Sequence, residues 1–223
     1  MSRVRSSCIS GYATKAQFWK LRPALKNWIA IIDEFVRRRG EPPYVFSNYE
    51  RVNCGLLAAG FWQARIPVLH ETAVMRKGKR LFGRADLNFW LGRTEYFIEA
   101  KMSWLNLGVF RDVGSAAGEL DRRLERASKD SRKYIFSPKD RWIATVFVVP
   151  SVPEKEWGQD LARARLLAEF VSAVRLVKAD MKAWILPRGL ARWRAVEKGC
   201  ESYCYYPAVA VLGRRVKKGK RRA

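Results

Sequence analysis

Asp86, Glu99 and Lys101 are the residues of this sequence whose types and spacing best suit catalysis. The aspartate is followed by twelve residues and then by the triplet Glu99-Ala100-Lys101. Two carboxylates about 5 Å apart on neighbouring strands repel each other unless a cation lies between them. Oxygen ligands at that separation suit Mg²⁺ or Mn²⁺, and a nearby lysine can donate to a water molecule or a phosphate oxygen. These residues therefore predict metal-dependent chemistry at a phosphate group.

A β-hairpin is the element that would bring these residues together. Runs rich in branched and aromatic residues cover 81–91 and 95–102, on either side of Gly92-Arg93. A two-residue turn there pairs residues whose numbers sum to 185, so Asp86 is expected directly opposite Glu99. Side chains alternate along a strand, which puts Lys101 on the same face as Glu99 and opposite Arg84.

This arrangement resembles the PD-(D/E)xK nuclease superfamily, which has the restriction-endonuclease-like fold. The resemblance rests on Asp86 and on the Glu99-Ala100-Lys101 element at the end of a strand, and it covers about 47–149. It implies that Asp86, Glu99 and the main-chain carbonyl of Ala100 hold the metal ion. It also implies that Lys101 orients or activates water and that Glu50, on the preceding helix, completes the catalytic site. Ala85 stands where the family's name has proline, a position that the family keeps loosely.

The same residues also have purely structural explanations. Asp86 and Glu99 could be solvent-facing strand residues that neighbouring cations neutralise. Glu50 follows Ser47 by three positions, which is the spacing of a capping box, and a capping role would explain Glu50 without catalysis. The sequence leaves both explanations open.

The pattern of apolar residues indicates how the rest of the chain is organised. Recurrence every three or four positions predicts helices at 17–39, from Ser47 to before Pro67, at 115–134 and at 159–184. Strands are expected at 66–75, 81–91, 95–102, 141–149 and 203–212, the first three as an antiparallel meander. The order α-α-β-β-β-α-β-α-β predicts one α/β domain over 1–213, with a mixed sheet flanked by helices and an extra N-terminal helix. A basic flexible tail is expected at 214–223.

The charge of the chain points to a polyanionic partner. Forty-four Lys and Arg against 21 Asp and Glu give a net charge of +23, and seven of the cations lie in the last ten residues. The rest of the chain therefore keeps a charge of +16, which favours binding to nucleic acid by the folded part as well. The residues expected to contact DNA lie at a hairpin tip, on a strand and on one helix: Arg76, Lys77, Lys79, Arg80, Arg84, Arg122, Arg123, Arg126, Lys129, Arg132 and Lys133.

Several other classes of protein are disfavoured. The longest run without a charge, 52–64, is too short to span a membrane, and no secretory signal is evident, so a cytoplasmic location is expected. His70 is the only histidine, which excludes Cys₂His₂ zinc sites and His-based metal triads within one chain. A Ser-His-Asp triad would depend on His70, which lies in a strand-like run, and the sequence has no Gly-x-Ser-x-Gly elbow. The four cysteines have no zinc-ribbon or redox spacing and are expected to be reduced.

The sequence thus predicts a Mg²⁺- or Mn²⁺-dependent nuclease that hydrolyses phosphodiester bonds in DNA, with endonuclease action expected. The competing hypothesis is a non-catalytic basic protein of the same or a similar fold that binds DNA or RNA through counterion release. An RNA-bound structural protein anchored by the basic tail is a third hypothesis. Substrate structure, cleavage polarity and the formation of a homodimer stay open.

Overall fold

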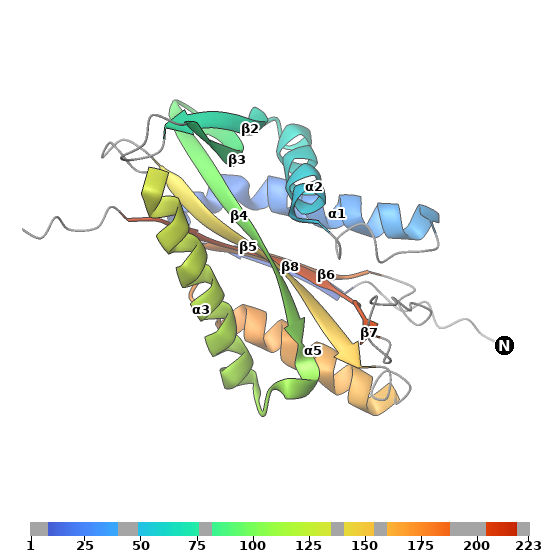
Figure 1. Ribbon diagram of the computed structural model, residues 1–223. Coiled ribbons are helices and arrows are strands. Elements are labelled where there is room, and N and C mark those ends of the chain that lie inside the picture. Colours follow the sequence, from blue (N-terminus) through green and yellow to red (C-terminus); the bar gives the residue numbers. More distant parts are fainter. Residues whose placement is uncertain are drawn as a thin grey trace, which may run out of the picture.

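A computed structural model of the chain describes residues 9–39, 49–75, 82–134, 141–153, 160–187 and 204–217 (Figure 1). Its α-helices are α1 (Arg22–Arg39), α2 (Glu50–Gln63), α3 (Val113–Ser131) and α5 (Asp160–Leu176). Short 3₁₀ turns are η1 (Ala16–Leu21), η3 (Leu107–Val109) and η4 (Arg132–Tyr134). The strands are β1 (Ile9–Thr14), β2 (Val68–Met75), β3 (Phe82–Leu91), β4 (Thr94–Asn106), β5 (Trp142–Pro153), β6 (Met181–Leu186), β7 (Cys204–Tyr205) and β8 (Val209–Arg215).

The strands form one mixed sheet in the order β1-β6-β8-β5-β4-β3-β2, with β7 paired to the end of β5. β2, β3 and β4 are an antiparallel meander, as the sequence predicts. β4 and β5 are parallel, and α3 lies between them in the chain, because parallel neighbours need a crossover connection. The predicted α/β class with a mixed sheet flanked by helices is confirmed.

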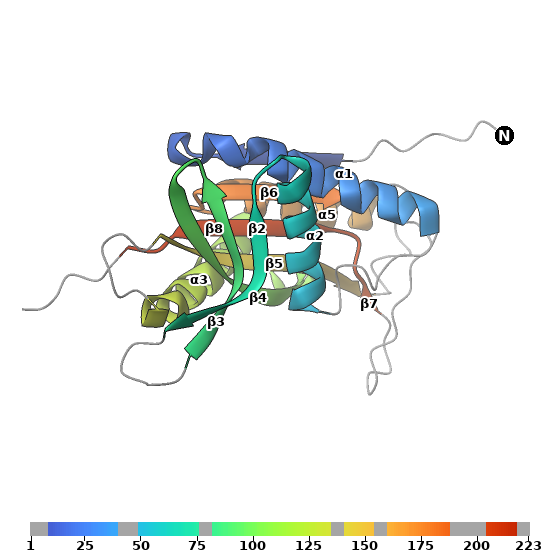
Figure 2. The same cartoon turned by 90° about the horizontal axis from the view of Figure 1, so that it is seen from above.

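Helices cover both faces of this sheet (Figures 1 and 2). α1 and α2 pack on one face, where Trp28, Phe61 and Phe89 belong to one apolar cluster. α3 and α5 pack on the other, where Leu124 and Phe170 belong to a second cluster. β5 is buried on both faces, which explains its near-continuous apolar sequence.

The C-terminal third differs from the sequence prediction. The helix expected over 159–184 ends at Leu176, and Met181–Leu186 forms β6 beside β1, a strand that was not expected either. The ammonium group of Lys182 donates to the carbonyls of Val174 (3.3 Å), Arg175 and Val177 (3.0 Å) and so caps the end of α5. The end of α5 is therefore capped by a side chain from the next strand. No Gly or Pro, the usual sequence signals of a helix end, marks this position.

The expectation of a flexible tail from position 214 is wrong for its first residues. Arg214 and Arg215 belong to β8, and the backbone N–H of Val216 donates to the carbonyl of Trp142 at 2.8 Å. Arg214 also binds Asp121 of α3 at 2.6 Å, which ties this end of the strand to a helix. Of the expected tail, the residues from 218 onward lie outside the described part of the chain. None of the described helices is long and apolar enough to cross a membrane.

Two glycines of α2 allow a test of the packing between α1 and α2. A Cβ on Gly60 would lie 2.6 Å from the carbonyl oxygen of Ala24, whereas a Cβ on Gly55 would meet nothing within 4 Å. Gly60→Ala should therefore lower the free energy of unfolding by about 1–3 kcal/mol. Gly55→Ala, the matched control, should raise it by about 0.5–1 kcal/mol because Ala favours the helix. Urea unfolding measures both, and equal effects of the two substitutions would contradict the close approach of the helices.

Candidate active site

The candidate site lies where β3 separates from β4. The two strands pair from Leu91–Thr94 to Leu87–Ile98, in the register that the sequence predicts. Beyond that point β3 stays paired with β2, while β4 continues beside β5. The expected pairs Asp86–Glu99 and Arg84–Lys101 are therefore both wrong, because the ladder between β3 and β4 ends at Leu87–Ile98, just before them.

This separation leaves backbone amides of β4 without a partner strand, and two carboxylates take its place. Oδ2 of Asp86 accepts a hydrogen bond from the N–H of Ala100 at 2.6 Å. Oε2 of Glu50 accepts one from the N–H of Met102 at 3.0 Å. Alternate N–H groups of a strand point to the same side, so both acids line the same edge of β4.

Glu50 does not start its helix in the way that a capping box requires. It is the first residue of α2, and Tyr49 is the N-cap residue. A capping box needs the glutamate three residues after the cap, and Ser47 lies outside the described residues. The bond of Glu50 to β4 instead joins the start of α2 to the sheet.

Glu99 and Lys101 complete the group from β4 itself. Glu99 is 8% exposed, and its Oε1 accepts a hydrogen bond from Nζ of Lys101 at 2.9 Å. Residues 99 and 101 point to the same face because strand side chains alternate. The structure thus brings together all four side chains that the sequence assigns to catalysis, from three different elements.

Burial raises the pKa of each carboxyl group in this cluster, and the charges of neighbouring acids add to the effect. Burial raises the pKa of Glu50, and the nearby charge of Asp86 adds to the effect. Burial also raises the pKa of Asp86, although the N–H of Ala100 and the charge of Lys101 oppose the shift. Burial is the main cause for Glu99 too, opposed by Lys101 and reinforced by Asp86 and Glu50. The protein therefore holds three carboxylates where their charged forms are costly.

The pKa of Lys101 is raised as well, but its acidic neighbours cause the shift and burial opposes it. Burial alone would lower the pKa of its ammonium group, but the hydrogen bond to Glu99 and the charges of Glu50 and Asp86 raise it overall. Lys101 is therefore protonated at neutral pH. With all four groups ionised, three negative charges face one positive charge. A divalent cation would neutralise the two negative charges that remain.

The donor set suits such a cation. Carboxylate and carbonyl oxygens are the ligands that Mg²⁺ and Mn²⁺ prefer. The N–H and C=O groups of a paired strand residue point to the same side, so the carbonyl of Ala100 faces the edge where Asp86 lies. Among the described residues, no three His, Cys, Asp or Glu side chains already form a group of ligands. Asp86 and Glu50 are instead bonded to backbone amides, and Glu99 is bonded to Lys101.

Glu71 is a residue of this region that sequence reasoning missed. It lies in β2 between residues that pair with Leu87 and Ala85, which places it across from Asp86, and it has a φ of +48°. Its carboxylate binds Nε of Arg51 at 3.1 Å and Nη1 of Arg84 at 2.9 Å. Arg51 is adjacent to Glu50 in α2, so Glu71 links the helix to the hairpin. A non-glycine residue with positive φ inside a strand leaves no signal in the sequence.

Of the eleven cations expected to contact DNA, Arg84 is bound to Glu71, and the other ten fall into three groups. Arg76, Lys77, Lys79 and Arg80 lie outside the described residues. Four cations of α3 and η4 are paired with acids of α3: Arg122 and Arg123 with Glu119, Arg132 with Glu125, and Lys133 with Asp130. Arg126 and Lys129 are exposed and have no ion pair within the described part of the chain. Whether any of these side chains contacts DNA stays a prediction.

Comparison with models of known protein families, with curated proteins and with solved structures gives no match to this chain.

The raised pKa of Glu50 predicts how stability depends on pH. A carboxyl group whose pKa is raised by folding costs stability above its folded pKa and costs nothing below its unfolded value of about 4.5. Glu50→Gln keeps an acceptor for the N–H of Met102 but removes the charge. It should therefore raise the free energy of unfolding at neutral pH, and the gain should vanish as the pH falls toward 4.5.

Glu34 of α1 is the matched control for this prediction. Its side chain is exposed, and hydrogen bonds from Arg37 and Arg38 lower its pKa. Glu34→Gln should therefore leave stability at neutral pH unchanged or lower it. Urea unfolding of both variants across this pH range is the measurement, and a loss of stability in Glu50→Gln at neutral pH would contradict the electrostatic description of the site.

Proposed function

We propose that this protein is a metal-dependent nuclease that hydrolyses phosphodiester bonds in DNA. The observation that carries the proposal is that Asp86 and Glu50 are bonded to the N–H groups of Ala100 and Met102 on one edge of β4, beside the Glu99–Lys101 pair of the same strand. Three partly buried carboxylates with raised pKa values cost stability, and such groups are typical of functional sites. The same residues carry the resemblance to PD-(D/E)xK nucleases.

The donor set assigns roles to individual residues. Asp86, Glu99 and the carbonyl of Ala100 would hold a Mg²⁺ or Mn²⁺ ion, and Glu50 would complete the acidic group. Such an ion, when bound, stabilises negative charge on the phosphate and lowers the pKa of a bound water. It would also relieve the repulsion between the carboxylates.

Lys101 acts as a hydrogen-bond donor in this proposal. The surrounding acids raise the pKa of its ammonium group, so Lys101 carries a proton that it can donate at neutral pH. An ammonium group next to the metal ligand Glu99 can donate to the attacking water or to an oxygen of the phosphate. Both contacts stabilise the extra charge that develops as water attacks.

The net charge of +23 supports a nucleic acid as the substrate, because cations that neutralise phosphates release counterions. The same charge would serve a non-catalytic protein that binds DNA or RNA. Cleavage of plasmid, single-stranded and branched DNA with Mg²⁺, Mn²⁺ or EDTA separates the two. The nuclease hypothesis predicts cleavage that EDTA stops, and the alternative predicts binding with no cleavage under any of these conditions.

Removal of either metal ligand should abolish cleavage and leave DNA binding in place. We expect Asp86→Ala and Glu99→Ala each to lower the single-turnover rate by a factor of about 10³ or more, which corresponds to about 4 kcal/mol. DNA affinity should be equal or higher, because a negative charge is lost. Glu169→Ala, which removes a partly exposed acid of α5 paired with Arg165, is the control and should cleave at the parent rate. Mg²⁺ calorimetry in which both Ala variants bind metal like the parent would refute the site.

Substitution of Lys101 tests whether its shape matters as well as its charge. Lys101→Arg keeps a positive charge but replaces a compact ammonium by a broad planar group that does not fit the same contact with Glu99. We expect a loss of about 10²-fold in the cleavage rate for Lys101→Arg and at least as much for Lys101→Ala. The measurement is the cleavage rate of each variant at saturating DNA and metal. Full activity in Lys101→Ala would remove this residue from the mechanism.

A further inference from the structure

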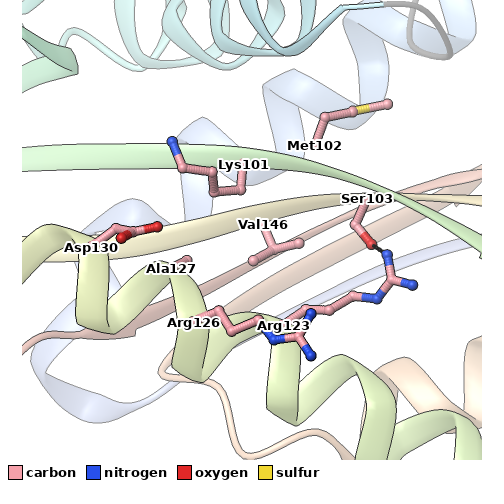
Figure 3. A pocket seen from close by; sticks show the side chains of 8 residues that line it. All are labelled: Lys101, Met102, Ser103, Arg123, Arg126, Ala127, Asp130 and Val146. Carbon is pink, nitrogen blue, oxygen red and sulfur yellow. Dashed lines mark hydrogen bonds between the residues drawn. The ribbon is translucent and has the colours of Figure 1, made fainter.

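A pocket of about 350 Å³ adjoins the candidate active site on the α3 side of the sheet (Figure 3). β4 and β5 form one wall and α3 forms the other. The lining residues are Lys101, Met102, Ser103, Arg123, Arg126, Ala127, Asp130 and Val146. Lys101 belongs both to this pocket and to the acidic cluster, so a ligand in the pocket would lie directly beside the metal ligands.

Arg123 is held in place on the helix wall of this pocket. Its Nε donates to Oε1 of Glu119 at 2.7 Å, and its Nη1 donates to the hydroxyl of Ser103 on β4 (Figure 3). These bonds fix the guanidinium across the space between helix and strand. Because Arg123 is already paired, it shapes the pocket and leaves the binding of an anion to another residue.

Arg126 is the cation that remains available there. It lies three residues after Arg123 on the same wall, is exposed, and has no ion pair among the residues that the structure describes. The one acid of the pocket, Asp130, is bound to Lys133 at 2.6 Å, which offsets its charge. The pocket therefore presents an unpaired guanidinium, the group that suits a phosphate because it can donate two parallel hydrogen bonds.

The size and the rest of the lining indicate a ligand larger than a phosphate ion. A volume of about 350 Å³ lies within the range of about 300–1,000 Å³ that small-molecule sites have. Ala127 and Val146 lie at the floor of the pocket but are each only 1% exposed, so the apolar surface for a sugar or a base comes from the carbon stems of Lys101 and Arg126. A cation that can bind a phosphate group, together with apolar carbon surface beside it, matches a single nucleotide.

We propose that this pocket binds one nucleotide of the substrate strand, next to the phosphate that is cleaved, with Arg126 contacting its phosphate group. The identification of the ligand as part of a nucleic acid rests on the proposed function. Arg126 is then a positioning residue: it holds the neighbouring nucleotide so that the reacting phosphate meets the metal site and Lys101.

The test is binding of thymidine 5′-monophosphate in EDTA, where cleavage plays no part. Calorimetry should show binding by the parent chain, weaker binding of inorganic phosphate, and the weakest binding of thymidine, which lacks the phosphate. Arg126→Ala should weaken binding of the monophosphate about tenfold, and Arg126→Lys should recover part of it. Arg126 is exposed, so these variants should fold like the parent.

Lys26→Ala is the matched control, since Lys26 is an exposed cation of α1 on the other side of the sheet. It should bind the monophosphate like the parent. The proposal is overturned if Arg126→Ala binds like the parent, if Lys26→Ala loses as much affinity as Arg126→Ala, or if inorganic phosphate binds as tightly as the nucleotide.

Cleavage assays keep this proposal separate from the proposed function. If the monophosphate binds through Arg126 but no DNA is cleaved, the proposed nuclease activity is overturned and the proposed nucleotide pocket is supported. If cleavage is metal-dependent but Arg126→Ala leaves its rate unchanged at both low and saturating DNA, the nuclease activity is supported and the nucleotide pocket is overturned. If both proposals hold, Arg126→Ala should lower single-turnover cleavage even at saturation while Lys26→Ala should not.

Discussion

The separation of β3 from β4 beyond the Leu87–Ile98 pair is the feature on which the site depends. A strand that loses its neighbour exposes N–H groups that must find other acceptors. Here the acceptors are the carboxylates of Asp86 and Glu50, which replace the missing strand at Ala100 and Met102. The backbone thus fixes the two acids along one edge, beside the side chains that β4 contributes.

This solution carries an electrostatic cost. The carboxylates of Asp86, Glu99 and Glu50 are desolvated and repel one another, as their raised pKa values show. Lys101 offsets only one of the three charges. The remaining imbalance would favour a divalent cation, and the same cation would make the site reactive toward a phosphate, so the feature that costs stability is the one that would support catalysis.

The sequence predicts this site well because hairpin register follows from turn length. The pairing from Leu91–Thr94 to Leu87–Ile98 is confirmed, and it places Asp86 near Glu99. The sequence could not reveal that β3 leaves β4 just there, because turn length fixes which residues pair and not where the pairing ends. The roles of these residues in metal binding and catalysis stay predictions.

The sequence predicts the rest of the fold where an element follows from a local pattern of residues. It fails where a tertiary contact sets the end of an element. The meander and the buried strand β5 follow from periodicity and composition. The end of α5 does not, since the cap is the side chain of Lys182 from a later strand. The basic helix α3 was predicted as a row of cations, yet its acids pair with most of them and leave Arg126 and Lys129 unpaired within the described chain.

Paramagnetic broadening by Mn²⁺ is the most direct test of the central claim that this acidic edge holds a divalent ion. At substoichiometric Mn²⁺, the backbone amide signals of Ala100 and Met102 should broaden first, together with those of Asp86 and Glu99. Excess Mg²⁺ should restore them, and Asp86→Ala should prevent the broadening. Broadening centred elsewhere, or equal broadening in the parent and in Asp86→Ala, would contradict the account.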